Sequence, residues 1–152
     1  MFIKVNMDKS IALPFYLPAE LADERQGVPL ASCPVPAGWP SPAEDYVEEE
    51  LDLHRYAVKN QAATFFVRAS GESMIGAGIF DGDILVVDKS VESKPGKVVI
   101  AAVDGEFTVK RLTRKNGKTW LTPENKAFKP LDITGRDDVV IWGVVTNVLH
   151  KL

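Results

Sequence analysis

Short runs of β-branched and aromatic residues occupy the chain from about residue 63 onward, with turn-forming residues between them. In order, these runs read ATFFVRAS, DILVVDKS, GKVVIAAV, EFTVKRLTR, KTWLTP and VVIWGVVTNVL. Apolar runs of this length, bounded by glycine, aspartate and asparagine, are typical of β-strands. The larger part of the chain is therefore predicted to be mainly β.

Two dipeptides, Asp104-Gly105 and Asn116-Gly117, predict how the central strands pair. Each suits a type I′ hairpin turn, which requires positive φ at both central residues. Together they predict a three-stranded antiparallel meander over residues 97–122.

The register of this meander places Lys110 on an apolar face. The first turn pairs Val99 with Lys110, and the second pairs Leu112 with Leu121. Side chains alternate between the two faces of a strand, so Lys110 shares its face with both pairs and with Ala101. We therefore expect Lys110 to have apolar neighbours. Such a setting removes hydration from the charged amine and lowers its pKa.

Prolines set the first third of the chain apart, since seven of the ten precede residue 50. Proline fixes φ, lacks a backbone donor and restrains the residue before it, so such a segment holds neither a long helix nor a central strand. Residues 1–44 are therefore predicted to form an extended arm, and residues 45–152 a β domain. The arm leaves no room for a helix-turn-helix domain.

A short helix is expected between the arm and the first strand. Ser41 and Pro42 suit a helix start, and acidic residues follow in the first turn. The helix would end before Lys59, and its acidic run at residues 48–50 would face water. Its apolar stripe would consist of Tyr46, Val47, Leu51 and Leu53.

Composition narrows the class of protein without indicating an activity. The chain has 152 residues, of which 45% are hydrophobic and 26% charged, which is the profile of one globular domain. Its formal net charge of −3 gives no general reason to bind nucleic acid. The basic stretch KRLTRKNGK spans the second predicted turn and is interpreted as a solvated hairpin tip.

We expect a cytoplasmic protein without disulfide, metal or cofactor. The single cysteine, Cys33, excludes an intramolecular disulfide. No apolar run approaches the roughly 20 residues of a membrane helix. The two prolines of IALPFYLPA argue against a signal peptide. No Cys/His cluster offers a metal site, and the glycines match neither a P-loop nor a dinucleotide-binding fingerprint.

The stretch ASGESMIGAGIFDGDI places Ser73 among glycines. A turn explains such glycines, and so does a nucleophile that a substrate backbone must approach closely. A serine in contact with a neutral lysine would form the Ser-Lys pair of acyl-transfer chemistry. Ile75 occupies the position that the G-x-S-x-G elbow requires to be glycine, and His54 and His150 lie in no motif, so each histidine is interpreted as a surface residue.

The segments FFVRASGESMIGAGIFDGDILVVD and GKVVIAAVDGEFTVKRL, in this order, resemble the LexA-like self-cleaving serine peptidases of the bacterial SOS response. Within that family the likeness is to the UmuD-like accessory subunits of error-prone translesion DNA polymerases. Upstream, AGWPSPAEDYVE resembles the segment that contains the family's self-cleavage bond. The resemblance runs from about Val35 to the C-terminus and implies the LexA/UmuD C-terminal-like β domain.

The resemblance also implies a role for each matching residue. Ser73 would be the nucleophile, Lys110 the general base, and Ala37–Gly38 the bond that is cut. The expected partners are a second copy of the chain, a RecA filament on single-stranded DNA as activator, and a Y-family translesion polymerase subunit. Sequence-specific DNA binding and membrane binding are not expected. Two other readings stay open: a non-enzymatic polymerase-binding module, and a transcriptional corepressor with the same fold.

Overall fold

The structure is a computed structural model that describes residues 2–4, 27–30, 37–38 and 49–152. Strands dominate this part of the chain, with one short α-helix and two single 3-10 turns, labelled η. In chain order the elements are β1 (Phe2–Lys4), β2 (Val28–Leu30), β3 (Glu49–Leu51), α1 (Leu53–Ala57), η2 (Gln61–Ala63), β4 (Thr64–Arg68), η3 (Ile75–Ala77), β5 (Ile84–Asp88), β6 (Val98–Val103), β7 (Glu106–Lys115), β8 (Lys118–Thr122), β9 (Leu131–Asp132) and β10 (Val139–Leu149).

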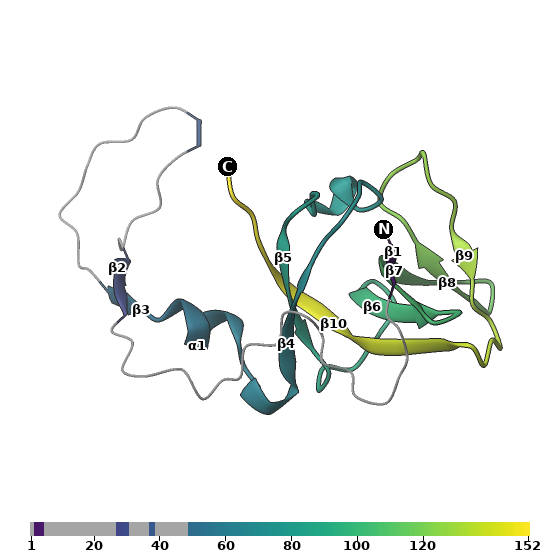
Figure 1. Cartoon of the computed structure of the whole chain (residues 1–152), viewed down its shortest axis with the longest axis horizontal. Helices are drawn as coiled ribbons and strands as arrows, with labels where there is room; N and C mark the ends of the chain where they lie inside the picture. The colour runs from purple at the N-terminus through teal and green to yellow at the C-terminus, as the bar shows by residue number, and fades with distance from the viewer. Residues whose placement is uncertain (1, 5–26, 31–36, 39–48) are drawn as a thin grey trace.

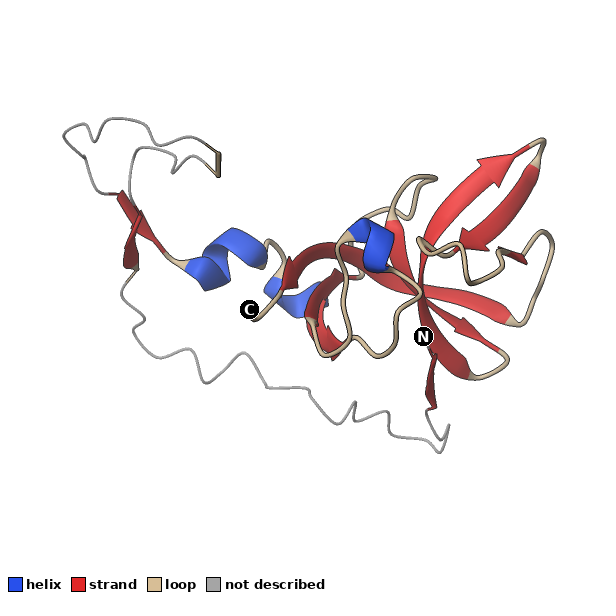
Figure 2. Ribbon diagram, turned by 90° about the horizontal axis from the view of Figure 1, so that it is seen from above, coloured by secondary structure: helices blue, strands red, loops and turns tan. Residues whose placement is uncertain are grey.

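Eight of the described strands form one antiparallel sheet. Its order is β4-β5-β10-β6-β7-β8-β9, and β1 adds to it beside β7. Strands β2 and β3 form a separate two-stranded ladder, which lies with α1 at the left of the molecule in Figure 1. Figure 2 shows the main sheet from above, strongly bent, with its strands fanning apart. The predicted mainly β fold is confirmed.

The predicted meander is present with the predicted register. Asp104 and Gly105 have φ of 50° and 79°, and Asn116 and Gly117 have φ of 52° and 75°, as a type I′ turn requires. Val99 pairs with Lys110 and Leu112 pairs with Leu121 across the two hairpins. The turn chemistry in the sequence was sufficient to predict which residues face each other.

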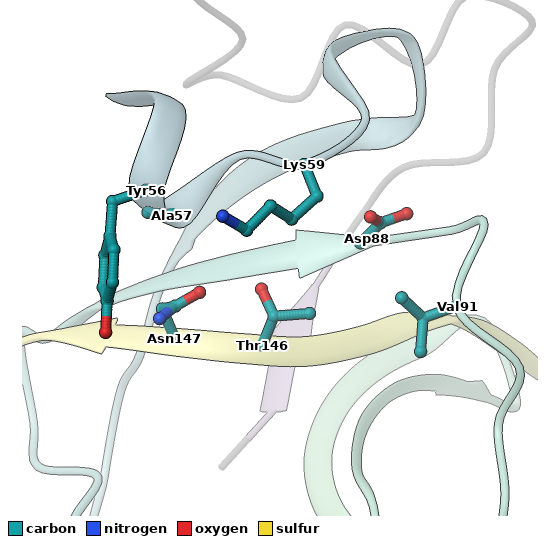
Figure 3. A pocket seen from close by; sticks show the side chains of 7 residues that line it. All are labelled: Tyr56, Ala57, Lys59, Asp88, Val91, Thr146 and Asn147. Atoms are coloured by element: carbon teal, nitrogen blue, oxygen red, sulfur yellow. The ribbon is translucent and has the colours of Figure 1, made fainter. Parts of the chain in front are cut away.

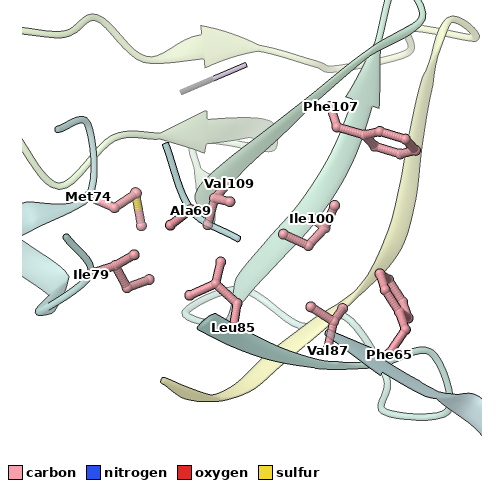
Figure 4. Close-up of a cluster of buried hydrophobic side chains, with 9 residues drawn as sticks. All are labelled: Phe65, Ala69, Met74, Ile79, Leu85, Val87, Ile100, Phe107 and Val109. Carbon is pink, nitrogen blue, oxygen red and sulfur yellow. The ribbon is translucent and has the colours of Figure 1, made fainter. Parts of the chain in front are cut away.

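Alternate residues of β6 and β7 supply two apolar clusters, one on each face of the sheet. The first cluster, shown in Figure 4, contains Phe65, Ala69, Met74, Ile79, Leu85, Val87, Ile100, Phe107 and Val109. The second contains Val99, Ala101, Val103, Leu112, Leu121 and Val144. Since the turn between β4 and β5 contributes Met74 and Ile79 to the first cluster, this turn is anchored in the core.

The long strand β10 joins the two halves of the sheet. Its first half pairs with β6 and its second half with β5, with register shifts on both sides of Val144. Figure 1 shows it crossing the molecule between β4–β5 and β6–β8. A Cβ added at Gly143 would lie 2.8 Å from Val87 Cγ1, so the crossing needs a residue without a side chain.

The predicted helix is wrong over much of its described length. Glu49–Leu51 form a strand that pairs with Val28–Leu30, and only Leu53–Ala57 are helical. The Asp52 side chain accepts a hydrogen bond from the Arg55 N–H and so fixes the helix start there. Pairing with a distant segment overrode the local helical pattern, because that pattern does not register long-range partners.

Parts of the predicted arm join described elements. Phe2–Lys4 pair with β7 in the main sheet, and Val28–Leu30 pair with β3. The predicted boundary between residues 44 and 45, the helix start at Ser41 and Pro42, and Cys33 lie outside the described residues.

Candidate active site

Ser73 lies in the turn between β4 and β5, and its side chain is completely buried. Glycine is needed at two points of this turn. Gly71 has φ of 86°, and a Cβ added at Gly76 would lie 2.5 Å from the carbonyl oxygen of Glu124. The Gly76 N–H donates to that same oxygen at 2.8 Å, and the Glu124 N–H donates to the Ser73 carbonyl at 2.8 Å. These two backbone hydrogen bonds hold the turn in place from the segment that follows β8.

Lys110 projects from β7 toward Ser73 and is 8% exposed. Its Nζ donates hydrogen bonds to Ser73 Oγ at 3.0 Å, to Thr108 Oγ1 at 2.9 Å and to the Val109 carbonyl at 2.9 Å. The two residues that the sequence singled out are therefore in direct contact, although 37 positions separate them.

The predicted apolar setting of Lys110 is confirmed. Val99, its cross-strand partner, and Leu112, two residues along β7, both belong to the second buried cluster. Burial lowers the pKa of Lys110 from 10.5 to about 8, because the charged amine loses its hydration. With this pKa, roughly a tenth of the molecules carry the neutral amine at pH 7.

The neutral amine changes what the Ser73–Lys110 contact can do. In the neutral state Nζ has a lone pair, so the Ser73 hydroxyl can donate to it and pass on its proton. The separation of 3.0 Å is within the range for direct proton transfer. The arrangement is thus suited to a serine nucleophile with a lysine base.

The predicted cleavage bond lies elsewhere in the structure. Ala37 and Gly38 are both exposed, and a Cβ added at Gly38 would meet no atom within 4 Å. Figure 1 shows residues 37–38 at the upper left, well apart from β7. The structure therefore brings Ser73 and Lys110 together but leaves the Ala37–Gly38 bond away from them.

Three polar residues around the site were not predicted. Thr108 contacts the amine directly, and strand alternation could have indicated it, since Thr108 shares a face with Lys110. Asn125 donates from Nδ2 to the Glu72 carbonyl at 2.9 Å. The Asp81 carboxylate accepts the Gly71 N–H at 2.7 Å. The roles of Asn125 and Asp81 depend on loop packing, which leaves no periodic signal in the sequence.

The two histidines differ in their surroundings. His54 lies in α1 and is partly exposed. His150 was expected to be a simple surface residue, yet its Nδ1 lies 2.6 Å from Oδ1 of the buried Asp83, and its ring contacts that of Phe80. The other Asp83 oxygen accepts the Phe80 N–H at 2.8 Å. This contact ties the end of β10 to the turn that follows Ser73.

A cavity of about 330 Å³ lies between α1, β5 and β10, separate from the Ser73–Lys110 pair. Figure 3 shows Tyr56 and Lys59 on one side of it and Thr146 and Asn147 on β10. Its lining consists of Tyr56, Ala57, Lys59, Asp88, Val91, Thr146 and Asn147. Neither Ser73 nor Lys110 is among these residues.

Two other surface features bear on the sequence predictions. The basic stretch KRLTRKNGK is a solvated tip only in part, since residues 114–118 are all exposed whereas Lys110 is buried and Arg111 is half-buried. Within the described part of the chain, no helix has the length and apolar character needed to cross a membrane.

Comparison with known proteins identifies a family that the chain matches over most of its length. The Peptidase S24-like family matches residues 29–146. The chain is 50% identical over 123 residues to Protein SamA of Salmonella typhimurium strain LT2, covering 81% of this chain and 85% of that protein. It is 44% identical over 142 residues to Protein ImpA of Escherichia coli, covering 90% and 94%. It is 36% identical over 144 residues to the LexA repressor of Ectopseudomonas mendocina strain ymp, covering 94% and 69%.

Proposed function

Since the chain belongs to the peptidase S24-like family, among its UmuD-like members, we propose that it is a serine peptidase of bacterial SOS mutagenesis that cuts its own Ala37–Gly38 bond. In this proposal Ser73 is the nucleophile and Lys110 the general base. The observation that carries it is the 3.0 Å contact between a fully buried serine hydroxyl and a buried lysine amine. A Ser-Lys pair of this kind performs acyl transfer in peptidases of other folds.

The first half of the reaction forms an ester. Neutral Lys110 takes the proton of the Ser73 hydroxyl while Oγ attacks the carbonyl carbon of Ala37. The protonated amine then gives that proton to the nitrogen of Gly38, and the carbon–nitrogen bond breaks. The products are a Ser73 ester of Ala37 and a new amino terminus at Gly38.

The second half releases the arm. A water molecule attacks the ester carbonyl while Lys110 accepts its proton, and the proton returns to Ser73 Oγ as the ester bond breaks. The arm then ends in the Ala37 carboxylate, and the chain 38–152 retains an intact Ser73–Lys110 pair.

Delivery of the arm governs the rate in this proposal. The pair is already in contact, whereas the Ala37–Gly38 bond lies apart from it (Figure 1). Tethering replaces substrate binding, so a low population of the docked arm suffices for slow cleavage. An activator such as a RecA filament would raise that population without adding a catalytic group.

The cleaved form, residues 38–152, would act as the accessory subunit of an error-prone translesion polymerase, as a homodimer. This role is supported by the family match over residues 29–146. It is also supported by the similarity to SamA and ImpA, which extends over most of the length of each protein. The sheet strands from β4 to β10 and their core lie within residues 64–149, so removal of residues 1–37 leaves them in place and takes away only the β1–β7 and β2–β3 pairings of the described residues.

Two complementary variants test the assignment of nucleophile and bond. Ser73→Ala keeps a cleavable arm but loses the nucleophile, and Gly38→Glu keeps the nucleophile but blocks the bond. Each alone should stay intact under activating conditions. If the active site can act on another molecule's arm, a mixture releases residues 38–152 from the Ser73→Ala chain only, with Gly38 as the new first residue by N-terminal sequencing. Cleavage of Ser73→Ala by itself would show that Ser73 is not the nucleophile.

A further inference from the structure

The strand that carries Lys110 has an edge that the neighbouring strand β8 leaves open. On one side, β6 pairs with Glu106–Arg111. On the other side, β8 pairs only with Arg111–Lys115. The stretch of β7 that leads to Lys110 therefore presents backbone N–H and C=O groups beyond the reach of β8. Such an edge binds extended segments readily, because backbone groups of any sequence can pair with it.

This edge has an occupant in the structure, the N-terminal strand β1. Phe2 pairs with Thr108, Ile3 with Phe107 and Lys4 with Glu106, in antiparallel orientation. Figure 1 shows β1 lying beside β7. The first residues of the chain thus cover the edge to within two positions of Lys110.

One of the covered positions, Thr108, touches the catalytic amine, and so does the residue next to it. Thr108 accepts a hydrogen bond from Lys110 Nζ through Oγ1, and the adjoining Val109 accepts one through its carbonyl oxygen. The same Nζ reaches Ser73 Oγ at 3.0 Å. A backbone segment paired along this edge therefore runs directly past the Ser73–Lys110 pair.

The sequence around the Ala37–Gly38 bond is suited to one open edge. Prolines occupy positions 34, 36, 40 and 42, all even, while positions 33, 35, 37 and 39 keep their N–H groups. Successive residues of a strand point their backbone groups to opposite sides. In an extended segment with this pattern, the backbone N–H groups of the odd-numbered residues point to one side and can donate there. The opposite side carries a single N–H group, that of Gly38. The segment can therefore pair with one neighbour only, as edge strands with proline do.

From these observations we infer that the β7 edge at Glu106–Val109 is the surface of the site that binds an extended strand. Residues 33–39 pair with this edge through their odd-numbered positions, and β1 competes with them for it. The inference rests on the proposed self-cleavage. While β1 is paired, the cleavage segment is excluded and the chain stays intact. When a chain acts on its own arm, both segments are tethered to the same edge, so their relative pairing strength sets the balance, not the protein concentration.

A reversible crosslink tests this competition. Lys4 and Glu106 lie directly opposite each other, so Lys4→Cys with Glu106→Cys, in a Cys33→Ser background, can form a disulfide that holds β1 on the edge. Under oxidation, self-cleavage at about pH 9 should fall about tenfold or more, because the competent population is removed. A reductant should restore it. The matched control is Cys33→Ser alone, whose cleavage rate should not depend on oxidation.

A second variant weakens the pairing instead. Ile3→Pro removes a backbone donor from β1 and should raise the rate of self-cleavage about threefold or more, since proline disrupts strand pairing. Ser10→Pro, the same kind of change in the arm outside β1, should leave the rate near that of the wild type.

The outcomes separate the inference from the proposed function. If no disulfide forms between positions 4 and 106, the β1 pairing is wrong whatever the cleavage rate. If the crosslinked chain cleaves as fast as the reduced chain, β1 does not compete, and the proposed function stands. If the wild type and the reduced variant both stay intact at alkaline pH, the proposed function fails, and the inference fails with it.

Discussion

Lys110 owes its suitability as a base to its neighbours. An exposed lysine is almost entirely protonated at neutral pH, whereas the burial of Lys110 between strands lowers its pKa to about 8. The sequence already predicted this setting, because the two hairpin turns fix which face of β7 bears Lys110. Contact with Ser73 could not be predicted from the residues alone, since it depends on how a loop packs.

The pH dependence of cleavage follows from this pKa. Below pH 8 the rate of self-cleavage should rise about tenfold per pH unit, and it should level off above about pH 8 to 9, because only the neutral amine accepts the Ser73 proton. The measurement is the first-order rate of loss of the intact chain from pH 6 to 10, without activator. A rate that is flat over this range would contradict Lys110 as the base.

The lowered pKa of Lys110 also predicts how the stability of the fold depends on pH. The folded chain releases the Lys110 proton near pH 8 and the unfolded chain near 10.5, so stability should rise with pH across this window. Relative to Lys110→Met, the free energy of unfolding should increase by about 3 kcal/mol between pH 8 and 10.5, at 1.36 kcal/mol per pKa unit. Urea unfolding of both proteins on a Ser73→Ala background, which prevents cleavage, measures the difference. A constant difference would show that Lys110 titrates normally.

Thr108 is expected to position the amine. Thr108→Val keeps the shape and the β-branch but removes the Oγ1 that accepts from Nζ, so plateau cleavage should slow by about tenfold, a change of about 1.4 kcal/mol in barrier. Losing an acceptor for the charged amine should also move the midpoint of the pH profile to lower pH. Thr108→Ser should restore both properties. A slower rate with an unchanged midpoint in Thr108→Val would indicate a structural effect only.

At the scale of elements, the sequence predicted what local chemistry determines. The meander of β6, β7 and β8 appeared with the predicted register because Asp104-Gly105 and Asn116-Gly117 each specify one turn type. The helix over residues 41–58 was wrong where β3 pairs with β2, and β1 was not foreseen. Each error involves pairing between distant segments, which propensity and periodicity do not report.

The two backbone hydrogen bonds that hold the Ser73 turn against Glu124 can be tested at Gly76. In Gly76→Ala the new methyl group would lie 2.5 Å from the Glu124 carbonyl oxygen, so the two backbone hydrogen bonds that hold the turn must distort. We expect the melting temperature to fall by several degrees, as about 1 to 2 kcal/mol of lost stability implies, and cleavage to slow. Gly38→Ala is the matched control, because its methyl group meets no atom and its melting temperature should not change. Equal melting temperatures for the two variants would show that the contact between the Ser73 turn and Glu124 does not need glycine at position 76.

In the whole molecule, the Ser73–Lys110 pair and the bond proposed as its substrate are separate parts of one chain. Ser73 and Lys110 are held together by a sheet whose core spans the β domain, while the Ala37–Gly38 bond lies apart (Figure 1). In the proposed self-cleavage, control therefore lies in delivery of the Ala37–Gly38 bond and not in assembly of the Ser73–Lys110 pair. The family match includes both parts, since it covers residues 29–146.

The most direct test of self-cleavage by Ser73 and Lys110 is the intact mass of the purified chain over time. It is measured at about pH 9 and, separately, at neutral pH with RecA filaments on single-stranded DNA. If the chain cuts its own Ala37–Gly38 bond, the wild type is replaced by two species, residues 1–37 and residues 38–152, in both conditions. Ser73→Ala and Lys110→Ala should keep the full mass and the wild-type circular dichroism spectrum. Three results would contradict this mechanism: a folded wild-type chain that stays intact in both conditions, a cut at another bond, or cleavage of either variant at the normal rate.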